Sequence, residues 1–433
     1  MTFSNRPGAA GRFTKANPTC PPPNFQTDSG PSMKITLVTR EFFPLTGGLQ
    51  ALAAQLGQEL QKKGCDFDII TRFTNERKAL ERHLTESEKD QVTERKSIRT
   101  HIIGHSHFSS LFLRHTYALL FRKTAYRLPV SIFSHTYEEK IARVITNTDV
   151  VHFLGQGLEL LGFAALSAAR KLGKPFIVEP CVHPGQWGDH FVDLRLYRQA
   201  DALIAHTRFE KQFLESHGIA SQKIHVLHGF EDRTDGDGSR FRKKYNITGK
   251  LVLFLGRRSQ DKGYPIAVKA FLDALKDHPD ARLVVIGPPD DYQIQVPSPY
   301  QNYVIELGLV EECEKHDALA ACDVLCVPSA GESFGMVYME AWRYKKPVIA
   351  RKIPVLEEIN GNYPGGILVE NHPEDEKVAE HVSSALSMLL GDMQLCQKLG
   401  ERGFHIASRF TWENVIERYI MLYQHALETS KKQ

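Results

Sequence analysis

Short apolar segments alternate with amphipathic segments along this chain, and they do so in two separate series. In the first series, an apolar segment at 33–39 is followed by a glycine turn, by leucines spaced three and four residues apart, and by a second apolar segment at 66–71. This order within about forty residues is typical of a βαβ unit, whose strands are parallel. The second series begins at 251–256. Because 433 residues exceed one ordinary core, we predict an α/β protein with two doubly wound parallel sheets in tandem.

The composition is that of a soluble globular protein, and its net charge of +3 is too small to indicate a nucleic-acid partner. No apolar run approaches the length of a membrane-spanning helix. The seven cysteines include no Cys-x-x-Cys pair, which favours free thiols in a reducing, cytoplasmic compartment. The predicted parts are a disordered N-terminal extension (1–32), an N-terminal domain (33–230), a linker (231–248), a C-terminal domain (249–410) and a final helix (411–428).

Residues 72–128 interrupt the first series with twelve Lys or Arg and six Asp or Glu. The later part of this basic insertion interleaves its bases with large apolar residues, so it could rest on an anionic membrane surface. The interpretation we favour is a charged helix packed on the domain with its apolar stripe inward. An Asp-x-Asp pattern at 66–68 falls inside a predicted strand, and we predict no metal site there.

The segment 328–344 reads as a tight loop followed by a helix, after an apolar strand. Two carboxylates lie eight residues apart, Glu332 in the loop and Glu340 in the helix. The backbone N–H groups of Ser333, Phe334 and Gly335 would lie at the helix start, where unpaired donors and the helix dipole suit a phosphate. Carboxylates on either side would then bind sugar hydroxyls. The alternative is that Glu332 caps the helix and Glu340 is a solvated helix charge.

Three other loops carry candidate residues. Arg257 and Lys262 flank a glycine-bounded turn after a strand and could clamp a diphosphate, although loop bases are usually just solvated. Gly47 and Gly48 precede the first helix and could allow close approach of a ligand; for an isolated Gly-Gly pair, a turn with positive φ is the explanation we favour. His183 lies in a loop at the C-terminal end of a strand, where ligands of open α/β sheets bind. It could equally be a histidine bonded to the backbone.

These motifs together resemble the family-4 glycosyltransferases of the GT-B fold, over residues 33 to about 428. The resemblance rests on Thr46-Gly47-Gly48, on Gly256-Arg257 through Lys262-Gly263, and on Glu332-Ser333-Phe334-Gly335 followed by Glu340. It implies two Rossmann-like domains, with the nucleotide sugar bound mostly by the second and the final helix packed on the first. Arg258 departs from the family, in which an apolar residue is more usual, and so does Cys181, where relatives often have a second His.

The resemblance also implies a role for each motif residue. Arg257 and Lys262 would neutralise the leaving diphosphate, and Glu340 would bind the ribose. Glu332 would lie beside the transferred sugar, which His183 would contact near its reacting carbon. The remaining donor-binding residues implied by the resemblance are Gly47, Gly48, Ser333, Phe334, Gly335 and Met336.

The implied activity is retaining transfer of a hexose from a nucleotide-diphosphate sugar to a hydroxyl of a glycan, glycolipid or small-molecule acceptor. No cofactor and no metal would be required, and peripheral contact with the inner membrane face through 72–128 is a further hypothesis. Two alternatives stay open. One is another enzyme of the fold, such as a nucleotide-sugar 2-epimerase, and the other is a catalytically silent protein that binds a nucleotide sugar.

Overall fold

The computed structural model describes residues 33–45, 47–75, 79–95, 97–105, 107–289 and 294–431. These residues belong to the unit Met33–Gln433. The extension 1–32, predicted to be disordered, lies outside the described residues, and so do Thr46 of the first glycine motif and parts of the basic insertion.

The first sheet has eight strands in the order β3-β4-β2-β1-β5-β6-β7-β8. Its strands are β1 (Lys34–Thr39), β2 (Asp66–Thr71), β3 (Gln91–Arg95), β4 (Ile98–Ile102), β5 (Val150–Leu154), β6 (Phe176–Glu179), β7 (Ala202–Ala205) and β8 (Ile224–Val226). Neighbouring strands are parallel, except that β3 runs antiparallel to β4. In the centre, Leu37 of β1 lies opposite Ile69 of β2 and His152 of β5.

Helices lie between most of these strands. They are α1 (Gly48–Lys62), α2 (Leu80–Thr85), α3 (His107–Thr116), α4 (Arg127–Val144), α5 (Leu161–Lys171), α6 (Phe191–Tyr197) and α7 (Arg208–Ser216), with short 3₁₀ turns η1 (Tyr117–Phe121), η2 (Ile145–Asn147), η3 (Gly157–Glu159) and η4 (Ser221–Lys223). Side chains of a strand alternate between its two faces. Leu37 therefore belongs to a core that includes α1 residues, whereas its neighbour Val38 belongs to the core formed with α4 and α5. The central strands of the sheet are buried on both faces, as a doubly wound fold requires.

The second sheet has six parallel strands in the order β11-β10-β9-β12-β13-β14. They are β9 (Leu251–Leu255), β10 (Arg282–Ile286), β11 (Val304–Gly308), β12 (Val324–Cys326), β13 (Val348–Arg351) and β14 (Gly366–Val369). The helices are α8 (Gly238–Lys244), α9 (Tyr264–Ala274), α10 (Glu312–Ala321), α11 (Met336–Arg343), α12 (Pro354–Asn360), α13 (Asp375–Gly391) and α14 (Met393–Ser408), with the 3₁₀ turn η5 (Ser298–Tyr303).

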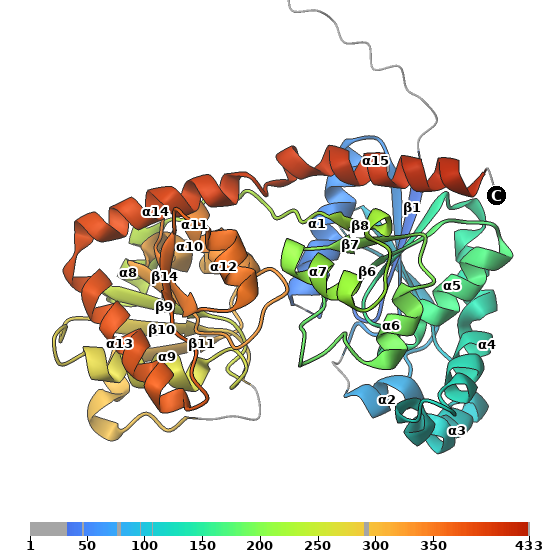
Figure 1. Cartoon of the computed structure of the whole chain (residues 1–433). Helices are drawn as coiled ribbons and strands as arrows, with labels where there is room; N and C mark the ends of the chain where they lie inside the picture. The colour runs from blue at the N-terminus through green and yellow to red at the C-terminus, as the bar shows by residue number, and fades with distance from the viewer. Residues whose placement is uncertain are drawn as a thin grey trace, which may run out of the picture. The chain divides into compact units, whose positions relative to one another are not determined.

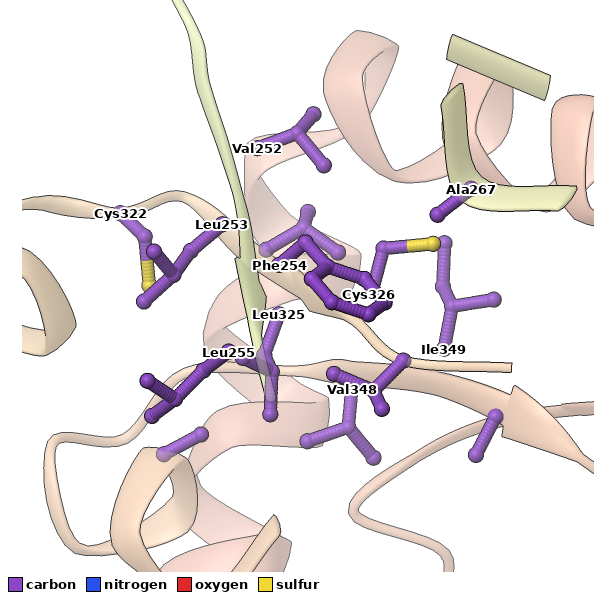
Figure 2. Packing of buried hydrophobic residues seen from close by; sticks show 14 of the residues in the cluster. Val252, Leu253, Phe254, Leu255, Ala267, Cys322, Leu325, Cys326, Val348 and Ile349 are labelled. Atoms are coloured by element: carbon purple, nitrogen blue, oxygen red, sulfur yellow. The ribbon is translucent and has the colours of Figure 1, made fainter. Parts of the chain in front are cut away.

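Figure 2 shows the centre of the second core, where side chains of β9, β12 and β13 pack together with Ala267 of α9. Cys322 and Cys326 pack there as small apolar residues, and burial raises the pKa of each thiol to about 12. The six described cysteines form no disulfide.

The strand order of the second sheet reverses between β9 and β12. Strands β10 and β11 follow β9 on one side, and β13 and β14 follow β12 on the other. The carboxyl edge at such a switch point is where open α/β sheets bind ligands. The loops that leave β9 and β12 at this edge are the two that carry Arg257, Lys262 and Glu332.

The basic insertion 72–128 contains more than the packed, charged helix that we expected in its later part, where Leu113 and Leu120 are buried in the first domain. It contains α2, β3, β4, α3 and η1, and its two strands extend the first sheet. Ile98, Thr100 and Ile102 of β4 are buried while Arg99 between them is exposed. This alternation with a period of two is the strand signal that the surrounding charges obscured in the sequence.

Two segments connect the sheets. Helix α8 lies inside the predicted linker 231–248, and its Phe241 is buried in the core of the second sheet. The final helix, α15 (Trp412–Ser430), packs against α1 and β5, with Tyr419 and Tyr423 buried in the first domain (Figure 1). In the part of the chain that the structure describes, no helix is both long enough and apolar enough to cross a bilayer.

Candidate functional site

The loop after β12 ends at Gly335, which has a left-handed backbone (φ 88°). A Cβ at this position would lie 2.6 Å from the Tyr338 ring, so the position requires glycine. Helix α11 then begins at Met336, and no side chain caps it. Its first N–H groups keep the unpaired donors and positive potential of a helix N-terminus, which can bind an anion.

Glu332 does not cap α11; it pairs with Lys262 instead. The Glu332 Oε1 atom lies 2.7 Å from Lys262 Nζ, and the two side chains are only 11% and 19% exposed. This excludes the capping alternative for Glu332 and brings together two predicted residues from different loops.

Glycine at position 263 allows the two loops to meet. Gly263 is left-handed (φ 71°) and lies at the start of α9, and a Cβ there would be 2.2 Å from the carbonyl oxygen of Pro328. The amide of Ala330 also donates to the carbonyl of Asp261 at 2.8 Å. The turn after β9 is therefore seated directly on the loop after β12, and any larger residue at 263 would separate them.

Arg257 and its neighbour Arg258 make different contacts. Arg257 Nη2 lies 3.0 Å from Asp261 Oδ2 within the same turn, and the Arg257 side chain is 38% exposed. Arg258, the residue that departs from the family, pairs with Glu306 of β11, to which Tyr264 also donates a hydrogen bond. Arg258 thus joins the turn to the edge strand β11.

Glu340 is not a solvated helix charge. Its Oε1 atom lies 3.0 Å from Lys315 Nζ on α10, and its side chain is 14% exposed. Lys315 also lies 2.5 Å from Glu312. Burial lowers the pKa of Lys315, but the carboxylates of Glu340 and Glu312 outweigh that effect and raise it above its ordinary value. Lys315 could not be identified from its sequence position, because it is on a different helix and in no motif.

His183 lies in the loop after β6, with its ring against Trp187 at a centroid distance of 4.2 Å. Its Nδ1 atom is 3.1 Å from the carbonyl oxygen of Cys181. A carbonyl only accepts, so Nδ1 carries the proton and Nε2 keeps its lone pair. Burial lowers the pKa of His183 to about 4; nearby Glu332 opposes this effect and Lys262 adds to it. His183 is therefore neutral near pH 7 and within electrostatic range of the Lys262–Glu332 pair.

A close packing contact holds the His183 loop against the loop after β12. A Cβ on Gly331 would lie 2.7 Å from the side-chain amide of Gln186. The candidate residues of the two sheets, His183 on one side and Lys262 with Glu332 on the other, are thus neighbours.

The Gly-Gly pair before α1 does not need positive φ, so the explanation we favoured is wrong. Gly47 has an extended backbone (φ 170°) and is the N-cap of α1. A Cβ on Gly48 would meet nothing within 4 Å. Thr46, which completes the motif, lies outside the described residues.

Phe334 has a packing role that the motif did not indicate. Its side chain is 1% exposed and contacts the His228 ring at 3.7 Å and the Phe410 ring at 5.1 Å between centroids. His228 follows β8 and Phe410 precedes α15, so Phe334 packs on both segments that connect the two sheets. Ser333 and Met336 flank this anchor and are partly exposed.

Family models match both halves of the chain. Residues 46–233 match glycosyltransferase family 4, and residues 237–405 match glycosyl transferases group 1. The chain belongs to glycosyltransferase family 4. In this family-4 protein, the loops at the β9–β12 switch point carry the motif residues Arg257, Lys262 and Glu332.

Curated relatives are similar over about half or over most of the chain. A D-inositol 3-phosphate glycosyltransferase from Acidothermus cellulolyticus is 30% identical over 53% of this chain and 54% of its own length. The match thus spans about half of that relative. A D-inositol 3-phosphate glycosyltransferase from Corynebacterium glutamicum is 24% identical over 91% of this chain and 97% of its own length.

Solved structures share the fold. Sucrose-phosphate synthase from Thermosynechococcus elongatus has a TM-score of 0.69 at 18% identity, covering 92% of this chain and all of the other. The Anabaena protein Alr3699/HepE in complex with UDP and glucose has a TM-score of 0.64 at 18% identity, covering 91% of this chain. These likenesses, with the two parallel sheets, establish the GT-B fold.

Proposed function

We propose that this protein is a retaining glycosyltransferase that moves a hexose from a nucleotide-diphosphate sugar to a hydroxyl of a glycan, glycolipid or small-molecule acceptor. The observation that carries the proposal is the convergence of Lys262, Glu332 and the uncapped start of α11 at the switch point of the second sheet. This arrangement offers positive potential for a diphosphate and a carboxylate for sugar hydroxyls within one small region.

At the diphosphate, the role that we propose for the site is electrostatic stabilisation of the leaving group. When the bond between the anomeric carbon and the phosphate oxygen breaks, negative charge develops on the diphosphate. Fixed cations and helix N-terminal N–H groups stabilise that charge without having to rearrange. Lys262 and Arg257 are the cations; Lys262 pairs with Glu332 of the loop after β12, and Arg257 pairs with Asp261 of its own turn. Because they supply the charge, we propose that transfer needs no added metal ion.

On the sugar side, Glu332 and the backbone N–H groups of 333–335 would bind the hydroxyls of the transferred sugar. His183 is neutral, with Nε2 free to accept a hydrogen bond from a hydroxyl near the reacting carbon. In the front-face reaction we propose, the acceptor oxygen forms the new bond on the side from which the phosphate leaves. The leaving phosphate oxygen takes the acceptor's proton, so no buried pair of carboxylic acids is required.

Glu340 would bind the ribose of the donor. Its carboxylate is held by Lys315 from α10 and is mostly buried, so its position is fixed before any ligand arrives. A carboxylate fixed in this way accepts hydrogen bonds from two vicinal hydroxyls at little cost in side-chain entropy.

Names of similar proteins suggest which substrates to try first. The curated relatives named above are D-inositol 3-phosphate glycosyltransferases, and the Anabaena protein was solved with UDP and glucose. We therefore propose UDP-sugars as first donors and a phosphorylated polyol as the first small-molecule acceptor.

A product assay by mass spectrometry tests the proposal. The purified full chain is incubated with UDP-, GDP-, ADP- and CDP-sugars, with and without inositol phosphates, in the presence of EDTA. We expect acceptor-dependent release of one nucleoside diphosphate and a glycoside whose anomeric configuration, read by NMR, matches the donor. Donor isomerised without acceptor would identify the epimerase alternative, and binding without turnover would identify the silent one.

We further propose that this is a cytoplasmic protein that touches an anionic membrane through one basic surface. This surface consists of α3, η1 and the start of α4, and its exposed residues are Leu111, Phe112, Arg114, Phe121, Arg122, Lys123, Arg127 and Leu128. Residues 107–137 contain no Asp or Glu. Each basic residue near an anionic surface contributes about 1 kcal/mol, and the exposed rings and leucines can enter the headgroup region.

Vesicle sedimentation tests the membrane contact. We expect binding to phosphatidylglycerol vesicles at low salt, weaker binding at high salt, and none to phosphatidylcholine. Replacing Phe112 and Phe121 by Ser should weaken binding, whereas Tyr363→Ser, which changes an exposed ring elsewhere, should not. A protein that stays in solution with anionic vesicles at low salt would exclude this contact.

A further inference from the structure

A buried cluster of metal-ligand residue types lies at the carboxyl ends of three adjacent strands of the first sheet. Glu179 is the last residue of β6, His206 follows β7, and His228 follows β8. Their side chains are almost inaccessible, since the three residues are 0%, 3% and 4% exposed. One carboxylate oxygen and one ring nitrogen from each histidine all lie within 4.8 Å of one another. The parallel order of β6, β7 and β8 brings these three residues to one point, although they are far apart in the sequence.

Glu179 is held rigidly in this cluster. Its Oε1 atom lies 2.7 Å from His206 Nε2, and its Oε2 atom lies 3.2 Å from His152 Nε2. His152 is fixed in turn by the Tyr423 hydroxyl, 3.0 Å from Nδ1. Carboxylates and histidines oriented by such outer partners are the usual surroundings of a protein metal ion.

His228 is the observation that points to a ligand. Neither of its ring nitrogens has a hydrogen-bond partner among the described residues, and His206 Nδ1 has none there either. Leaving a buried polar group unsatisfied costs about 1–3 kcal/mol. His228 contacts the Phe334 ring face, which offers no hydrogen-bond partner strong enough to offset that cost. A bound cation would give one of the two His228 ring nitrogens a partner and would account for a buried imidazole at this position.

Cys181, in the same loop as His183, lies at the side of this cluster, next to His206. Its Sγ atom lies 3.5 Å from His206 Nε2, its side chain is 3% exposed, and its backbone is left-handed (φ 51°). A non-glycine residue in this conformation is uncommon and strained. One thiol, two imidazoles and one carboxylate form a donor set that suits tetrahedral Zn²⁺, whereas Mg²⁺ and Ca²⁺ prefer all-oxygen sites.

We propose that Glu179, His206 and His228 bind a Zn²⁺ ion, with Cys181 as the fourth ligand. The ion is structural, because four protein ligands leave no open position, and it shares no residue with the Lys262–Glu332 pair. It fixes His228, whose ring supports Phe334, and so holds the sugar-binding loop in place. The proposal does not depend on the transfer activity and is separate from the metal-independent transfer proposed above.

Metal analysis of the purified full chain tests the site. After equilibration with Zn²⁺ and gel filtration, we expect about one equivalent of zinc per chain, as for a structural site. His228→Ala should lose it, while His278→Ala, which removes a histidine bonded to Ser387 in the second domain, should retain it. Zinc below about a tenth of an equivalent in the unaltered protein, or equal zinc in both variants, would overturn the proposal.

Cobalt substitution gives an independent readout, because the absorption spectrum of the folded, unaltered protein already tests the thiolate ligand. Co²⁺ bound to a thiolate gives a charge-transfer absorption in the near ultraviolet, so the unaltered protein should show it and Cys181→Ser should not. His152→Gln, which removes an outer partner of Glu179, should weaken zinc binding by roughly 10–100-fold. Absence of the thiolate band in the cobalt-loaded protein would exclude Cys181 as a ligand and overturn the four-ligand site.

Discussion

Replacing Lys262 by Met separates a catalytic role of this residue from a purely structural one. Methionine keeps most of the side-chain length and removes the charge that lies 2.7 Å from Glu332. If Lys262 stabilises charge that develops on the leaving diphosphate, kcat should fall by about 10²–10³, the usual loss for one preorganised electrostatic contact. Because this additional negative charge develops only in the transition state, KM should change much less.

The same substitution also has a cost in stability that the structure allows us to bracket. Exposed ion pairs contribute about 0.2–1 kcal/mol, whereas removing one partner of a buried pair costs about 3–5 kcal/mol. The side chains here are 19% and 11% exposed, between these limits, so we expect a loss of about 1–3 kcal/mol in unfolding free energy. Adding Glu332→Gln removes the unpaired charge and should restore part of this stability.

The assay is steady-state release of nucleoside diphosphate, together with urea unfolding of each variant. Lys269→Met is the matched control, since Lys269 lies on α9, the helix that follows the turn of Lys262, in an exposed pair with Glu376. We expect the double variant Lys262→Met/Glu332→Gln to regain stability and stay slow. A rate that recovers with stability, or a Lys262→Met rate within about fivefold of the unaltered protein, would refute the electrostatic role.

Three further outcomes follow from the geometry. Gly263→Ala should destabilise the protein by more than Gly308→Ala in urea unfolding, because both glycines are left-handed but only the first would press a Cβ to 2.2 Å from Pro328 O; equal losses, each about 1–2 kcal/mol, would show that the loops separate freely. The pKa of His183 is about 4, below the ordinary 6.5, so its contribution to stability is complete above pH 6.5 and is lost as pH falls from 6.5 to 4. An NMR titration should find His183 neutral at pH 6, and a midpoint near 6.5 would contradict the burial argument. Glu340→Gln should raise the donor KM roughly tenfold with little change in kcat, because ribose is bound equally in the ground and transition states; a large fall in kcat alone would contradict this role.

Much of the fold could be predicted because the central strands of both sheets are buried on both faces. Leu251–Leu255 is uniformly apolar and was recognisable as a strand without any partner. β4 was not recognised, because only alternate residues, such as Ile98 and Ile102, are buried among charges. Its identity as a strand depends on pairing with β2, which is not visible in the local sequence.

In the candidate site, too, some residues could be predicted from the sequence and others could not. Lys262 and Glu332 could be named from separate motifs, and the structure adds their direct contact. Lys315 could not be found, because its meaning depends on α10 lying beside α11. The cluster of Glu179, His206 and His228 has no characteristic spacing, since each residue ends a different strand and only the sheet order unites them.

The most direct test of the central claim is nucleotide binding to the unaltered protein and to Glu340→Ala. A thermal-shift experiment with UDP, GDP, ADP and CDP in EDTA measures it, because a ligand that binds only the folded state adds about 2.7 kcal/mol at a hundred times its Kd. We predict that one nucleotide raises Tm and that Glu340→Ala reduces this shift. No change in Tm with any of the four nucleotides would contradict a nucleotide-sugar site at the β9–β12 switch point.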